Sequence, residues 1–249
     1  RVGDPADFIV VEDLKTFTVT ATYINGEQVA AQGQPHLPSI QPVIVNHFAI
    51  QPILASQLAV SAEGDTIRVI QALDGQLITE ERHEKASIED GKVVADKKRD
   101  LLKFVVLNRY ADVAPAIGFI KGFGLQEGAI ASCVGHDSHN ILAVGVDDES
   151  LTRAINLIIE HKGGIAAVSS SDQQVLPLPI AGIMSDQDGH TVAKAYETLD
   201  AMAKQMGSSL HAPYMTLSFM ALLVIPQLKL SDKGLFDGQA FQVVDLFND

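Results

Sequence analysis

Four apolar segments of strand length follow one another between residues 101 and 146, and they constrain the fold more than any other feature of the sequence. Glycine or polar residues separate the segments, and each is shorter than a buried helix needs, which favours β-strands in a buried sheet. They occupy residues 101–107, 116–120, 128–134 and 140–146. We therefore predict a buried sheet at the centre of the main domain.

Two later segments have the apolar periodicity of helices. The first follows Asp147 and Asp148, either of which can cap it, and it ends at Gly163-Gly164. The second extends from about Gly189 to Met206 with a single apolar stripe. We expect further strands at 66–70, 77–79 and 165–168, and an exposed loop or hairpin at 82–98. The mixture predicts an α+β fold, and the absence of a fixed-period repeat or of eight βα units excludes a solenoid and a complete TIM barrel.

The first 36 residues read as β-structure. Residues 8–11 and 17–24 are rich in β-formers, and Asn25-Gly26 suits a two-residue hairpin turn. Prolines at positions 35, 38 and 42 then predict a break in regular structure. We expect three parts: a β-rich segment at 1–36, a linker at 37–45 and a mixed domain at 46–249. Because the chain begins without Met and enters a strand almost at once, we expect it to continue a longer polypeptide.

Charge and composition disfavour several classes of partner. The formal net charge of −13 repels nucleic-acid phosphates and anionic membranes, and the short basic run 97–99 lies between aspartates, as is typical of a solvated face. The longest apolar run, 219–225, is far shorter than the ~20 residues that span a bilayer. The single Cys133 has no disulfide partner in the chain and fits a reducing compartment. We therefore expect a cytoplasmic protein that binds neither nucleic acid nor membrane.

The candidate site is a polar turn between two of the apolar segments. Its side chains can act as general acids or bases, hydrogen-bond donors or metal ligands, and they are His136, Asp137, Ser138, His139 and Asn140. The same residue types are also common in turns that have only a structural role, and this alternative stays open. A metal site formed by this chain alone is disfavoured, because a His-x-x-His pair needs one or two further ligands.

Other candidate residues have simpler interpretations. The segment Gly122-Phe123-Gly124 lacks the third glycine and the helix of a dinucleotide-binding motif. Cys133 lies in an apolar segment and is expected to be a small core residue. Arg109 follows an apolar segment, where it can clamp a phosphate or carboxylate, although an exposed arginine at the end of a strand is the commoner case.

Several ordered blocks resemble a known family. The blocks are GFIKGFGL at 118–125, GAIAS at 128–132, HDSHN at 136–140, LPLPIAGIMS at 176–185, APYMTLSF at 212–219, IPQLKL at 225–230 and KGLFD at 233–237. Together they closely resemble the C-terminal region of bacterial adenine deaminases of the amidohydrolase superfamily. The β-rich segment 1–36 resembles the last strands of the β-sandwich that flanks amidohydrolase barrels.

The resemblance implies an enzyme that hydrolyses adenine to hypoxanthine and ammonia in purine salvage. In that family a manganese or iron centre lies in a TIM barrel and activates water. The family's His-x-His motif does not occur in this sequence, so we expect no cofactor in this chain and no activity without the barrel. The implied partners are the missing barrel domain, adenine and further copies of the protein in a homo-oligomer.

The resemblance also gives the polar turn a specific hypothetical role. We expect residues 136–140 to face the mouth of the barrel and to contribute purine contacts or a proton relay rather than metal ligands. Two alternatives remain from other functional classes. The region is a non-catalytic packing or dimerisation domain, or it is a free-standing module that binds a small purine.

Overall fold

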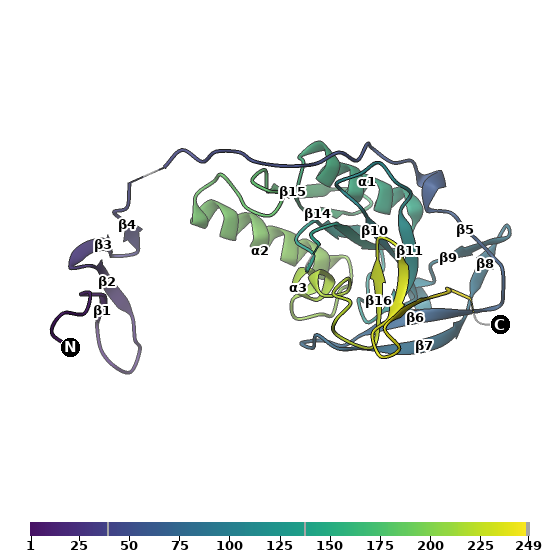
Figure 1. The fold of residues 1–249 in the computed structure, drawn as a ribbon, viewed down its shortest axis with the longest axis horizontal. Helices are drawn as coiled ribbons and strands as arrows, with labels where there is room; N and C mark the ends of the chain where they lie inside the picture. Colours follow the sequence, from purple (N-terminus) through teal and green to yellow (C-terminus); the bar gives the residue numbers. More distant parts are fainter. Residues whose placement is uncertain (39, 137, 248–249) are drawn as a thin grey trace. The chain divides into compact units, whose positions relative to one another are not determined.

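The computed structural model describes residues 1–38, 40–136 and 138–247, and the chain forms two compact units (Figure 1). The first unit is Arg1–Val43 and the second is Ile44–Asp249. In the described part of the chain, no helix combines the length and apolar character that crossing a membrane requires. The candidate turn belongs to the second unit.

The first unit is a four-stranded antiparallel sheet. Its strands lie in sequence order: β1 (Phe8–Val11), β2 (Val19–Ile24), β3 (Glu27–Ala31) and β4 (Gln34–Pro35). The hairpin prediction is confirmed, because Asn25 and Gly26 have φ angles of 50° and 82° between β2 and β3. Phe8 stacks on Tyr23 with 4.6 Å between ring centroids, and both Phe8 and Ile9 remain about half exposed. The origin of this sheet in a β-sandwich stays a prediction.

The second unit is built on an eight-stranded sheet, and its centre confirms the four predicted strands. These are β10 (Leu102–Leu107), β11 (Ala116–Lys121), β12 (Ala129–Ser132) and β13 (Ile141–Gly145). The other four are β6 (Thr66–Ala72), β7 (Thr79–Lys85), β14 (Gly164–Val168) and β15 (Gln173–Pro177). The order is β15-β14-β12-β13-β10-β11-β6-β7, and every neighbouring pair is antiparallel except β11 with β6.

Side-chain alternation along the central strand β10 divides the core in two. Leu102, Phe104 and Val106 enter one hydrophobic cluster, whereas Val105 and Leu107 enter another. The first cluster includes apolar residues of α2 (Gly189–Gln205), α3 (Pro213–Ser218) and the strands β16 (Leu228–Ser231) and β17 (Gly234–Asp237). The second includes the apolar face of α1 (Asp148–Glu160). Because both faces of the sheet are covered, its central strands have few polar side chains.

Both predicted helices are confirmed. Asp147 is the N-cap of α1, since its carboxylate accepts a hydrogen bond from the Ser150 backbone N–H at 2.6 Å. Asp148 has another role, because its carboxylate pairs with the ammonium of Lys103, which is only 2% exposed. Helix α2 occupies nearly the predicted range and begins at the N-cap Asp188. The mixed α+β class is therefore confirmed for the second unit.

The prediction for residues 82–98 is partly wrong. Residues 82–85 continue the edge strand β7, and residues 77–78 precede it rather than forming a strand of their own. The hairpin is real but shorter, with Asp90-Gly91 joining β8 (Ser87–Glu89) to β9 (Lys92–Val94). Two short 3₁₀ helices, Ala55–Leu58 and Lys97–Arg99, and the strands β5 (Val60–Ser61) and β18 (Gln242–Val244) complete the unit.

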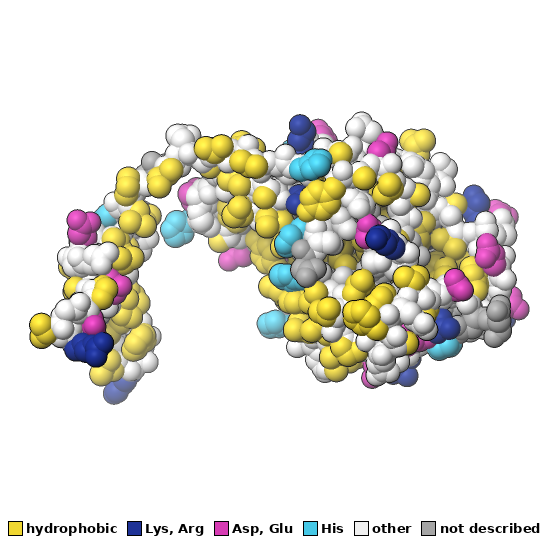
Figure 2. Space-filling model, viewed as in Figure 1, with side chains coloured by type: hydrophobic (Ala, Val, Ile, Leu, Met, Phe, Trp, Pro, Cys, Tyr) yellow, Lys and Arg dark blue, Asp and Glu magenta, His cyan; other side chains and the backbone are white. Residues whose placement is uncertain are grey.

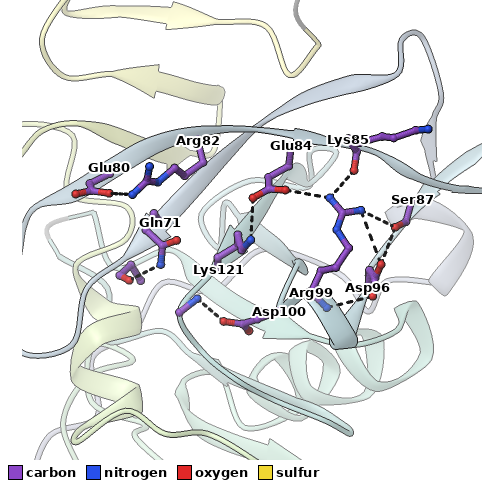
Figure 3. Close-up of polar contacts among 12 residues, drawn as sticks. Gln71, Glu80, Arg82, Glu84, Lys85, Ser87, Asp96, Arg99, Asp100 and Lys121 are labelled. Atoms are coloured by element: carbon purple, nitrogen blue, oxygen red, sulfur yellow. Dashed lines mark hydrogen bonds and ion pairs between the residues drawn. The ribbon is translucent and has the colours of Figure 1, made fainter.

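Ion pairs explain how so polar a segment forms a strand. Figure 3 shows that Glu84 on β7 accepts hydrogen bonds from Lys121 at 2.8 Å and from Arg99 at 3.0 Å. The Lys121 hydrogen bond is the main reason that the pKa of Glu84 is lowered. Arg99 also donates to the Lys85 carbonyl at 2.8 Å. The prediction that the basic run 97–99 is simply a solvated face is therefore wrong for Arg99, which joins the 3₁₀ helix to β7.

Candidate functional site

The described members of the predicted site, His136, Ser138, His139 and Asn140, lie on the connection from β12 to β13, at one end of the eight-stranded sheet. His139 adopts a left-handed φ of 54°, and its backbone N–H donates to the Gly135 carbonyl at 2.8 Å. A Cβ atom at position 135 would overlap the end of the Leu142 side chain, so a larger residue there would require that side chain to shift. Asp137, one of the predicted site residues, lies outside the described residues.

His136 is held against α3 by two contacts. Its backbone N–H donates to the carbonyl of Ser218, the last residue of the helix, at 2.7 Å. Its imidazole stacks on the Phe219 ring, with 4.6 Å between centroids and an interplanar angle of 30°. These contacts fix the direction of the ring, as a residue that binds or transfers a proton requires.

A small cavity of about 100 Å³ lies beside His136. Polar and aromatic side chains from several elements line it, among them Ser132, Ser218, Tyr196 and Tyr214. The Tyr214 hydroxyl donates to the Ala166 carbonyl at 3.2 Å, and burial raises the pKa of this phenol. The cavity therefore combines one imidazole with aromatic rings and hydroxyls.

The other described residues of the turn differ in exposure. His139 is half-buried, and 6.3 Å separates the centroid of its ring from that of His136. Ser138 is exposed, and its carbonyl accepts a hydrogen bond from the Tyr110 hydroxyl at 2.9 Å. Asn140 is 3% exposed, and its side-chain oxygen has no hydrogen-bond partner among the described residues. Figure 2 shows histidines among hydrophobic side chains on the face of this unit that it presents.

Arg109 is not the exposed strand-end residue that its sequence position favours. It is 4% exposed, and the segment 47–50 covers it, with the Ala49 N–H donating to the Arg109 carbonyl at 2.8 Å. Leu107 on β10 lies opposite Ile141 on β13, so Arg109 is at the same end of the sheet as the turn. Its Nη2 donates to the Tyr110 hydroxyl at 2.9 Å, which links Arg109 to Ser138. Sequence reasoning missed the burial of Arg109 because residues 47–50, which cover it, are remote from it in the chain.

Cys133 is a buried core residue, as predicted. Its thiol donates to the Gly182 carbonyl at 2.6 Å and accepts from the Gly164 N–H at 3.0 Å. Burial raises the pKa of the thiol to about 11, so it stays protonated at neutral pH and is a poor nucleophile.

The glycines at 122 and 124 bind a carboxylate of the protein itself. Their backbone N–H groups donate to the two oxygens of Asp100 at 2.6 and 2.8 Å. This arrangement fixes the start of the loop after β11, and Asp100 occupies the amides that a phosphate would need. A dinucleotide site at these glycines is therefore excluded.

The described residues do not fit a metal centre. No group of three or more His, Cys, Asp or Glu side chains in the described ranges is arranged to hold an ion. The two turn imidazoles can exchange protons or hydrogen bonds with a ligand, but the described residues around them offer no further ligand set. The His136 and His139 side chains at this end of the sheet can bind a ligand or transfer a proton.

Comparisons with known proteins match this chain over most of its length. A family model described as "Adenine deaminase C-terminal domain" matches residues 76–242. The chain is 51% identical to an adenine deaminase of Salinibacter ruber over all of its length and 46% of that protein. It is 51% identical to one of a Sulfurovum species, over 98% of the chain and 45% of that protein. It is 49% identical to an adenine deaminase of Methanosarcina acetivorans, over 99% of the chain and 46% of that protein. The chain thus spans about half the length of these relatives.

Proposed function

Because the chain belongs to the adenine deaminase C-terminal domain family, we propose that it forms the C-terminal part of an adenine deaminase. The observation that carries this proposal is the unequal coverage of the two proteins. The match to the Salinibacter ruber protein includes the whole of this chain but only 46% of that protein. The remaining polypeptide supplies the catalytic barrel, and the protein acts in cytoplasmic purine salvage.

The proposed reaction is the hydrolysis of adenine to hypoxanthine and ammonia. Manganese or iron, the metals that the family resemblance implies, supplies an activated water when it is bound. Since the described residues of this chain do not fit a metal site, the ligands belong to the remaining polypeptide. The isolated chain is therefore inactive toward adenine.

The role of this chain in the reaction is to present the turn between β12 and β13 to the base. The fixed His136 ring and the cavity beside it support this role, because a purine offers both ring faces for stacking and ring nitrogens for hydrogen bonding. His136 and His139 contact the purine or move a proton during the reaction.

The test uses a chimera in which this chain replaces the matched region of the Salinibacter ruber adenine deaminase. We expect His136→Ala and His139→Ala each to lower kcat/KM for adenine by about 10²–10⁴-fold, the usual contribution of a positioned acid or base. Metal content, measured by elemental analysis, stays unchanged.

The matched control is His190→Ala. His190 is exposed near the start of α2, and its backbone N–H donates to the Asp188 carboxylate. This variant retains full turnover. Unchanged turnover in the His136 and His139 variants, with intact metal, would contradict the proposed role of the turn.

A second candidate role is packing or dimerisation without catalysis. Exposed apolar residues favour it, since Val224 and Phe241 are 70% and 68% exposed on the same unit as the turn. Under this alternative, charged substitutions at these two positions shift the oligomeric mass and leave the activity per site unchanged. Light scattering of the chimera and its variants separates the two roles.

A third role, a free-standing purine-binding module, has a direct test. Calorimetry of the isolated chain with adenine measures the affinity of the cavity beside His136. We expect no measurable heat, because this chain provides only part of the site. Binding by the isolated chain would favour the module.

A further inference from the structure

The guanidinium of Arg109 is a buried charge that uses only part of its hydrogen-bonding capacity. Its Nη2 donates to the Tyr110 hydroxyl, but the buried Nε and Nη1 have no acceptor among the described residues. No described carboxylate lies within ion-pair distance of it. Arginine cannot lose its charge by deprotonation in a protein. A buried, unpaired guanidinium is destabilising, so this arrangement calls for a counter-charge.

The described groups around Arg109 do not provide that counter-charge. On one side Nη1 lies against the backbone of Gly182, where any larger residue would overlap it. On the other the Phe48 and Tyr110 rings lie 5.7 and 4.6 Å from the guanidinium carbon, in cation–π contact. The Tyr110 side of this cover is the more accessible one, because that residue is 38% exposed and belongs to the loop after β10.

Exposed apolar side chains surround this position. Val113 lies in the same loop as Tyr110 and is 46% exposed. Met184, two residues after Gly182, is 51% exposed, and Val45, whose carbonyl accepts a hydrogen bond from Ala181, is 68% exposed. A central arginine bordered by apolar residues is the usual arrangement of an energetically important interface position.

We propose that this end of the sheet is an interface at which a polypeptide segment from outside the chain brings an aspartate or glutamate carboxylate to Arg109. The proposal rests on the proposed function for the identity of that segment, which is the half of an adenine deaminase that this chain does not match. Arg109 then lies between the interface and the turn, because Tyr110 connects its guanidinium to the Ser138 carbonyl. The contact therefore places the turn relative to the rest of the enzyme.

The test compares Arg109→Met in two settings. In the isolated chain the substitution removes an unpaired buried charge, so we expect the melting temperature to rise by roughly 2–10 °C. The second setting adds the unmatched part of the Salinibacter ruber adenine deaminase as a separate polypeptide. The variant binds this second polypeptide at least about 10-fold more weakly than the wild-type chain does, because the carboxylate of the second polypeptide is left unpaired. An arginine whose partner carboxylate lies on another polypeptide therefore gives two opposite effects: its removal stabilises the isolated chain but weakens the complex.

Two further variants keep the test interpretable. Arg153→Met is the control, because among the described residues Arg153 donates to the neutral Ser169 carbonyl and Gln173 side chain. This variant changes neither the melting temperature nor the affinity for the second polypeptide. Arg109→Lys retains the charge, so the isolated chain gains no stability while binding stays within about 10-fold of wild type. This variant decides the question if the methionine variant does not fold.

Added acetate distinguishes the source of the carboxylate. At constant ionic strength we expect acetate to raise the melting temperature of the wild-type chain but not that of Arg109→Met. If acetate does so while the binding of the second polypeptide is independent of Arg109, the group is a site for small carboxylates and the interface proposal is overturned.

Loss of stability in the isolated Arg109→Met chain also overturns the proposal, since the guanidinium is then already satisfied within the chain. None of these measurements requires turnover. Binding that depends on Arg109 in a complex without deaminase activity would contradict the proposed function and support the interface.

Discussion

At the scale of single residues, Lys229 is a second buried cation without a carboxylate partner among the described residues. It is 0% exposed, and its ammonium donates to the Leu77 carbonyl at 2.7 Å. Burial lowers the pKa of Lys229 from 10.5 to about 8. A lysine whose pKa is lowered by folding binds its proton more tightly in the unfolded chain, so the protonated form opposes folding.

This cost has a predictable pH dependence. The penalty is fully present below pH 8, and it disappears as the pH rises from about 8 to about 10.5, because the unfolded state then loses its excess proton. We expect Lys229→Met to be the more stable protein at pH 7 by roughly 1–3 kcal/mol, and the advantage to shrink by pH 10. Urea unfolding at both pH values measures it. A stability difference between the two proteins that is the same at pH 7 and pH 10 would contradict the lowered pKa of Lys229.

The candidate site was only partly predictable from single residues. His136 and His139 were visible because polar side chains interrupt two apolar strands. The contacts that orient them were not visible, since Ser218 and Phe219 lie some 80 residues further along the chain. Arg109 resembled any exposed arginine after a strand, and its burial depends on residues 47–50 and on Gly182. Local patterns identify polar residues on a turn, but tertiary contacts decide which of them are buried.

At the scale of elements, α1 shows how one cap supports the sheet. The Asp147 carboxylate satisfies the Ser150 N–H and also accepts from the Ser150 hydroxyl at 3.1 Å. Helix α1 then packs Leu151, Ile155 and Ile158 on the sheet. Loss of the capping hydrogen bond therefore weakens a helix that covers much of one face of the sheet.

We predict that Asp147→Ala lowers the free energy of unfolding by about 1 kcal/mol, the typical value of an N-cap. Asp147→Ser retains an acceptor for the Ser150 N–H, so it lowers the free energy of unfolding by only about a few tenths of a kcal/mol. Chemical denaturation followed by circular dichroism measures both variants. An equal loss in the two would show that the charge of Asp147, rather than its capping bond, stabilises the helix.

The elements that the sequence predicted well are those with a single strong periodicity. The apolar strands β10 to β13 and the helices α1 and α2 are of this kind. Most of strand β7 was missed because Arg82 and Glu84 belong to the polar segment 82–98, which reads as an exposed loop or hairpin. Their charges are paired in the structure, Arg82 with Glu80 and Glu84 with Lys121. The strand order could not be predicted, because pairs such as β11 with β6 join segments far apart in sequence.

At the scale of the whole molecule, the three buried hydrophobic clusters of the described residues all belong to the second unit. Every residue of the three buried clusters lies beyond position 47. We predict that deletion of residues 1–43 leaves the melting temperature of the second unit within about 2 °C of its value in the intact chain. Differential scanning calorimetry of both forms tests this. A drop of 10 °C would show that the first unit stabilises the second.

The family assignment concerns the whole molecule in another way, because this chain spans about half of each relative. The described residues offer an oriented histidine, a small cavity and a buried arginine, but no metal-binding group. Under the proposed function, the part of these relatives that the chain does not match supplies the activated water, and this chain presents the base.

The most direct test is the rate at which adenine becomes hypoxanthine, measured for the isolated chain and for the chimera with the Salinibacter ruber protein. We expect no turnover by the isolated chain and turnover by the metal-loaded chimera. Turnover by the isolated chain, or a folded and metal-loaded chimera that does not convert adenine, would contradict the proposed function.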